Sequence, residues 1–175
     1  MPHEESLGRI SQLRYKGVFD FEQLYRLMRA WFAERQYEFF EVKYKDKDKT
    51  MGHELEITWR ADRKINDFCR NDIKMFIHCW DMNEMEVVKD GKKKKVFKGR
   101  MMITFDAALT LDYQGLWDST KLQRFLRELY IKHIIWHEID DIWGDKLWYE
   151  VNKLQQLVKR FLDMEAHSDV YDDMW

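Results

Sequence analysis

The stretch from Glu84 to Tyr113 (EMEVVKDGKKKKVFKGRMMITFDAALTLDY) constrains the fold of this chain more than any other segment. Asp90-Gly91 lies between two runs of β-forming residues. A two-residue type I′ turn needs positive φ at both central positions, which Asp and Gly tolerate. From Phe97 onward, most odd positions are apolar and most even positions are polar. This alternation indicates a long strand with one face in a core, so we expect an antiparallel hairpin.

Two further runs with the same period precede the hairpin and indicate a larger sheet. Residues 53–61 and 71–82 both alternate, and a shorter β-like run covers 37–44. The apolar positions that would share one core face are Leu55, Ile57, Trp59, Ala61, Ile73, Met75, Ile77 and Cys79. Together with the hairpin, these runs predict a meander of about four antiparallel strands.

Amphipathic segments on either side of the meander predict helices. Asp20 followed by Gln23 is a capping-box pattern, so the first helix should run from there to about Gln36. Ser119 or Asp118 is expected to cap the second helix. The apolar stripe of that helix would be Leu122, Phe125, Leu126, Leu129 and His133.

A third helix is expected after a break at Gly144, with Asp145 as its N-cap. Its apolar stripe would be Leu147, Val151, Leu154, Val158, Phe161 and Leu162. The resulting order predicts an α+β fold, in which one N-terminal and two C-terminal helices pack on one face of the sheet. We expect residues 18–166 to form a single domain, between a loosely ordered arm at 1–17 and an acidic tail at 167–175.

The composition fits a folded protein without a strong overall charge. Of its 175 residues, 45% are hydrophobic and 35% are charged, yet the formal net charge is −2. Such a chain has no global field that would attract DNA or an anionic membrane, so we expect neither as a partner. Cys69 and Cys79 are too few for a disulfide framework. Without a leader peptide or an apolar run near ~18 residues, we expect a cytoplasmic protein.

The second face of the strand at 71–82 is the leading candidate site. It would carry Phe76, His78 and Trp80, joined by Met102 from the neighbouring strand. Because a solvent-facing strand rarely has Phe and Trp two residues apart, this patch is typical of an interface. We therefore expect a non-catalytic binding or adaptor protein that contacts a protein partner or a second copy of itself. The alternatives are an apolar small-molecule groove and coverage by the arm or the tail.

A second candidate site is basic. Four lysines follow the expected turn, and they are Lys92, Lys93, Lys94 and Lys95. A positive hairpin tip can contact RNA phosphates and release counterions, so an RNA- or ribosome-associated protein is an alternative function. Lysines also protect an exposed hairpin from edge-to-edge aggregation. The lysines at 43, 45, 47 and 49 could add a second basic segment, which Asp46 and Asp48 would weaken.

A third candidate site is a metal half-site. His133 and His137 are four residues apart in a segment expected to be helical, and Asp141 lies one turn further on. Two imidazoles and one carboxylate could bind zinc or iron, although His133 also falls on the core stripe. No HExxH, GxSxG, phosphate-binding loop or CxxC motif is present. The sequence therefore favours a protein without catalytic activity or cofactor.

Overall fold

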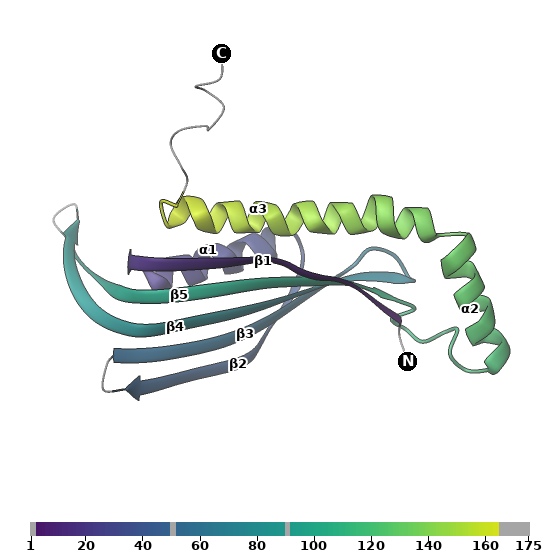
Figure 1. Cartoon of the computed structure of the whole chain (residues 1–175), viewed down its shortest axis with the longest axis horizontal. Helices are drawn as coiled ribbons and strands as arrows, with labels where there is room; N and C mark the ends of the chain where they lie inside the picture. The colour runs from purple at the N-terminus through teal and green to yellow at the C-terminus, as the bar shows by residue number, and fades with distance from the viewer. Residues whose placement is uncertain (1–2, 50–51, 90–91, 165–175) are drawn as a thin grey trace, which may run out of the picture.

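Five strands form one antiparallel sheet in the computed structural model, which describes residues 3–49, 52–89 and 92–164 (Figure 1). The strands are β1 (His3–Phe19), β2 (Glu38–Lys49), β3 (Gly52–Lys64), β4 (Cys69–Lys89) and β5 (Lys92–Leu111). Their spatial order is β1-β5-β4-β3-β2. The α+β class and the antiparallel meander, β2 to β5, are therefore confirmed, and β1 is an additional fifth strand. Lys89 pairs with Lys92, as a hairpin requires, while residues 90–91 lie outside the described residues.

The N-terminal segment forms β1, where the sequence predicts a loose arm. It pairs with β5 from His3 opposite Leu111 to Phe19 opposite Phe97. Without β1, the backbone of β5 would form a long unpaired edge. Irregular register conceals β1 in the sequence, because shifts between residues 6 and 8 and between 9 and 11 interrupt the alternation of period two.

Two helices cover one face of the sheet. They are α1 (Phe21–Glu34) and α3 (Asp145–Phe161), and both lie on the same side of the strands (Figure 1). The expected N-cap is confirmed, because Asp20 Oδ1 accepts a hydrogen bond of 2.9 Å from the Gln23 N–H. The core lies between these helices and the sheet. Every apolar position expected on the inner faces of β3 and β4 is at most 5% exposed.

The α3 stripe is confirmed, but the expected break at Gly144 is wrong. Five stripe residues are at most 5% exposed, and they are Leu147, Val151, Leu154, Val158 and Leu162. A π-helical turn, η1 (Glu138–Gly144), runs directly into α3 with helical backbone angles at Gly144. Because glycine here continues a helix, Asp145 begins the helix and is not its N-cap.

The helix α2 (Lys121–His133) lies beyond the end of the sheet and does not pack on its face (Figure 1). Thr120 caps it, in place of Ser119 or Asp118, through a reciprocal capping box with Gln123. The expected stripe does not face the core, because the buried residues of α2 are Arg127 and Ile131. In the part of the chain that the structure describes, no helix has the length and apolar character needed to cross a membrane.

An ion pair between two residues far apart in the sequence holds α3 against β3. Arg63 Nη2 lies 2.9 Å from both carboxylate oxygens of Glu150. The Tyr37 hydroxyl donates a hydrogen bond of 2.6 Å to Glu150 Oε2. The Arg63 guanidinium also lies over the Tyr37 ring, 4.5 Å from its centroid. These contacts join the helical layer to the sheet with a geometry that no local sequence pattern encodes.

Candidate functional site on the open face of the sheet

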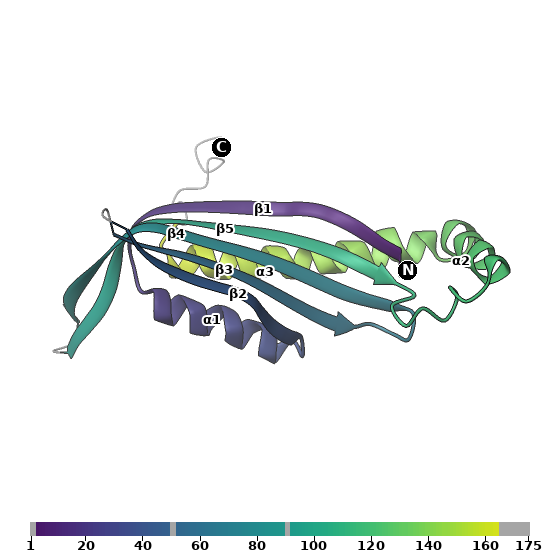
Figure 2. The ribbon, with the colours of Figure 1, turned by 90° about the horizontal axis from the view of Figure 1, so that it is seen from below.

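Among the described residues, no helix lies over the face of the sheet opposite α1 and α3 (Figure 2). The four predicted residues lie together on this open face. Phe76, His78 and Trp80 follow one another on β4, with ring centroids 6.0 Å and 4.9 Å apart. Met102 pairs with His78 from β5. All four are partly exposed. Residues 3–19 of the N-terminal segment do not cover them, because they form β1 at the edge of the sheet. The expected acidic tail at 167–175 lies outside the described residues.

The pleat of β4 separates the aromatic residues from the core. Their neighbours Ile77 and Cys79 are completely buried on the helix side, because successive side chains of a strand point to opposite faces. Burial raises the pKa of the Cys79 thiol to about 12. The adjacent pair His78-Cys79 therefore cannot act as a nucleophile and base, because the two side chains lie on opposite sides of the sheet.

Cationic residues flank the aromatic row on both sides. Three rows of residues cross the sheet at Phe76, His78 and Trp80. The rows at Phe76 and His78 are paired throughout, whereas a register shift of β3 interrupts the row at Trp80, and the pair of Lys47 and Glu54 lies at its other end. The cations in these rows are Lys16, Arg100, Lys47, Arg14, Lys45 and Lys43, and the carboxylates are Glu54 and Glu56. Six positive charges minus two negative charges give the rows a net charge of +4. Asp81, which pairs with Arg100 at the edge of the face, lowers this to +3.

The lysines of β2 form a more basic surface than the sequence indicates. Lys43, Lys45 and Lys47 pair with residues of the open face of β3. The intervening Asp46 pairs with Leu55, whose side chain is in the core. The alternation of Lys and Asp therefore places Asp46 on the opposite face from Lys45 and Lys47. Asp48, beside the turn, instead lines the same hollow as His78 and Trp80.

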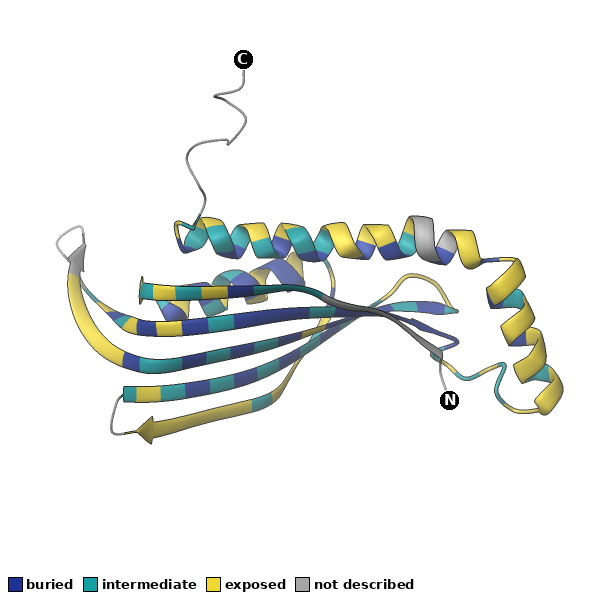
Figure 3. Cartoon of the chain, in the orientation of Figure 1, coloured by how far each residue is buried: buried dark blue, intermediate teal, exposed yellow. Residues whose placement is uncertain are grey.

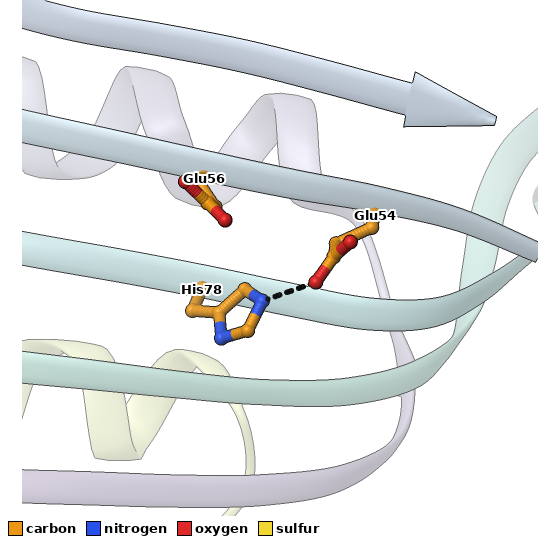
Figure 4. A group of neighbouring side chains, drawn as sticks. All are labelled: Glu54, Glu56 and His78. Atoms are coloured by element: carbon orange, nitrogen blue, oxygen red, sulfur yellow. Dashed lines mark hydrogen bonds and ion pairs between the residues drawn. The ribbon is translucent and has the colours of Figure 1, made fainter. Parts of the chain in front are cut away.

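Glu54 and Glu56 are site residues that sequence reasoning missed. Their carboxylates and the His78 imidazole lie within 4.8 Å of one another (Figure 4), with Glu54 Oε1 2.9 Å from His78 Nε2. Two carboxylates and one imidazole could hold a metal ion. However, Lys49 pairs with Glu54, and Lys43 Nζ lies 2.6 Å from Glu56. A metal would have to displace these lysines. We therefore interpret the two carboxylates as structural groups that hold the His78 ring in place between Phe76 and Trp80.

The protein is expected to lose stability as the pH falls from about 4.5 toward 2, partly through Glu54. Lys49 and His78 lower the pKa of the Glu54 carboxyl from 4.5 to about 2. The unfolded chain therefore takes up this proton first, so the contribution of Glu54 is present above pH 4.5 and is lost toward pH 2. Urea unfolding across this range should show a weaker pH dependence for Glu54→Gln. Asp46→Asn should behave like the wild type, and an unchanged slope in Glu54→Gln would contradict this role of Glu54.

The residues of the other two predicted sites are partly engaged in ion pairs or do not lie together. Lys94 Nζ lies 2.7 Å from Asp20, and Lys95 Nζ lies 2.6 Å from Glu84, so both are in ion pairs. The side chains of residues 92 and 93 lie outside the described residues. The helix α2 ends at His133 and the chain turns before His137, so the two imidazoles do not share one helix face. The Asp141 side chain also lies outside the described residues.

Neither a scan against protein-family models nor a search of the curated proteins found a match to this chain. The fold and the open face therefore define its class by themselves. It is an α+β protein with helices on one side of an antiparallel sheet and an aromatic, basic surface on the other.

Proposed function

We propose that the protein binds single-stranded nucleic acid across the open face of its sheet and does not catalyse a reaction on it. The observation that carries this proposal is the row of Phe76, His78 and Trp80 between two cationic flanks. Proteins that bind single strands combine aromatic side chains, on which unpaired bases stack, with positive charges that follow the phosphates. A duplex keeps its bases stacked inside, so it cannot use these rings.

A protein partner fits this face less well. A second copy of the chain would bring two surfaces of net positive charge together around a two-fold axis, which opposes association. The two carboxylates of the three rows are already paired with lysines. The exposed cations Arg14, Lys45 and Lys47 remain available to an anionic ligand. The charge therefore favours a ligand with regularly spaced negative groups.

The test is fluorescence anisotropy with a labelled uridine-rich 12-nucleotide RNA and a duplex of the same length. We expect tighter binding to the single strand, with an affinity that falls as salt rises. Trp80→Leu or Phe76→Leu should weaken binding roughly 5- to 150-fold, because each base stacked on an aromatic ring contributes about 1–3 kcal/mol. The matched control is Trp148→Leu on the outer side of α3, where the Trp is 46% exposed and the affinity should not change.

The phosphate contacts have a separate readout. Replacing Lys45 and Lys47 by Gln should reduce the slope of log K against log salt by roughly 1.4, at about 0.7 for each contact with a single strand. The comparison variant replaces the lysines at 92–95 by Gln and should change the slope less. Loss of binding in the hairpin variant alone would move the site to the hairpin. Equal affinity of the wild type and Trp80→Leu would contradict the proposal.

A further inference from the structure

A second surface lies on α2, most of which is exposed (Figure 3), and its large exposed side chains are apolar. Leu122, Phe125, Leu126 and Leu129 are 66, 57, 45 and 39% exposed, respectively. We call these four residues the outer stripe. Their spacing places them on one side of the helix, and Ile134 and Trp136 continue the exposed apolar surface along the chain.

The inner side of α2 fixes the orientation of the outer stripe. Arg127 is 8% exposed, and its Nη1 lies 3.3 Å from Asp112 Oδ2 and 3.7 Å from Asp118 Oδ1. The Tyr130 ring stacks on Trp117, with centroids 5.5 Å apart. Rotating α2 to bury its leucines would pull Arg127 out of this ion pair and leave the nearly buried Asp112 carboxylate unpaired, at a large cost in free energy. The contacts of Arg127 and Tyr130 on the inner side of α2 therefore keep the outer stripe facing solvent.

We propose that the outer stripe is the interface of a homodimer, in which the α2 helices of two copies pack antiparallel around a two-fold axis. A two-fold interface requires a patch that is complementary to itself. Leucine and phenylalanine at helical spacing satisfy this requirement, because the side chains of one stripe can fit between those of the other.

The size of the apolar surface fits a dimer. The outer stripe, Ile134 and Trp136 have exposed fractions between 39 and 69%. At roughly 200 Å² for each large apolar side chain, they expose on the order of 600 Å² per protomer. A standard interface buries about 800 Å² per partner, and in homodimers about 65% of this area is apolar. Apolar patches of this size on a soluble protein typically mark an interaction site.

The alternative occupant of an exposed apolar helix face is a lipid surface. The charged residues on the exposed surface of α2 are Lys121, Arg124, Glu128 and Lys132, a mixed set that differs from the strongly basic polar face of a membrane-binding helix. The size of the apolar patch therefore favours a second copy, and the vesicle measurement below tests the alternative.

This interface is separate from the open face. The α2 helix lies beyond the end of the sheet, on neither of its faces (Figures 1 and 2). A dimer through α2 would leave both open faces accessible, and the inference stands whether or not these faces bind nucleic acid.

The test is sedimentation velocity of the full chain between about 1 and 100 µM, because association depends on protomer concentration. We expect a species of twice the 21.7 kDa chain mass. Phe125→Glu should raise the dimer Kd at least about 30-fold, as loss of a central aromatic residue does. The matched control is Val42→Glu, which places the same charge on an apolar residue of β2 that is 64% exposed and should leave the Kd unchanged. Far-UV circular dichroism shows that each variant is folded.

A cross-link tests the geometry. Leu126 lies near the middle of α2, so antiparallel packing brings the two copies of this residue close to the two-fold axis. Leu126→Cys should be joined into a covalent dimer by a short bismaleimide, whereas Val42→Cys should not. The native Cys69 and Cys79 are fully buried and do not compete. A monomeric wild type at the highest concentration, an unchanged Kd in Phe125→Glu, a failed Leu126→Cys cross-link, or binding to phospholipid vesicles that Phe125→Glu abolishes would each overturn the proposal.

Discussion

Trp59→Ala is expected to lower the free energy of unfolding by about 3–5 kcal/mol, the range for removing a large aromatic residue from a core. Trp59 is 1% exposed on β3. Its ring makes edge contacts with Tyr25 and Phe39, at centroid distances of 4.8 and 4.9 Å. Its indole N–H donates a hydrogen bond of 3.2 Å to Glu41. The substitution would leave a cavity between α1 and the sheet that these rings cannot fill.

Urea unfolding followed by far-UV circular dichroism measures this loss. Trp59→Phe keeps most of the packing and loses the indole hydrogen bond, so it should cost about 1–2 kcal/mol. Trp148→Ala removes the same side chain where it is 46% exposed and should change stability by about 0.5 kcal/mol or less. Similar losses for Trp59→Ala and Trp148→Ala would show that Trp59 does not pack as the structure describes.

Asp72→Ala is expected to destabilise the protein by about 3 kcal/mol, although it removes a polar residue. Asp72 is 3% exposed on the open side of β4. Its carboxylate lies 2.7 Å from Arg60 Nη2 and 3.1 Å from Arg70 Nη2. It also accepts a hydrogen bond of 2.5 Å from the Thr110 hydroxyl. The substitution removes the acceptor of the Thr110 hydroxyl and one ion-pair partner from each of two arginines.

The expected loss lies at the low end of the range for breaking a buried ion pair. The Arg60 side chain is 41% exposed and can regain part of its hydration from solvent. The same urea experiment should show a smaller loss for Asp72→Asn, which retains an acceptor for Thr110. Asp46→Ala, with a side chain 56% exposed, should have almost no effect. A loss below about 1 kcal/mol in Asp72→Ala would contradict the structural role of this carboxylate.

These two residues differ in how far the sequence predicts them. Trp59 could be assigned to the core because alternation of period two is local and reports directly which face of a strand is buried. The same alternation predicted that Phe76, His78 and Trp80 share the other face. Asp72 could not be distinguished from the many surface carboxylates, because its burial depends on partners on β3 and β5 that only strand register brings together.

The sequence by itself determined the α+β class, the strands β2 to β5, the cap at Asp20 and the inward stripe of α3. Each of these features depends on residues close together in the sequence, either within one or two helical turns or along a single strand. The tertiary structure decided the rest. Register shifts concealed β1, cross-strand pairing joined Glu54 and Glu56 to His78, and pairing with β3 sorted the charges of β2 by face. The α2 stripe shows most clearly what the sequence does not predict. Helical spacing identifies the apolar side of a helix, but it does not say whether that side faces the core or solvent. The Arg127–Asp112 ion pair joins residues 15 positions apart, and it turns that side toward solvent.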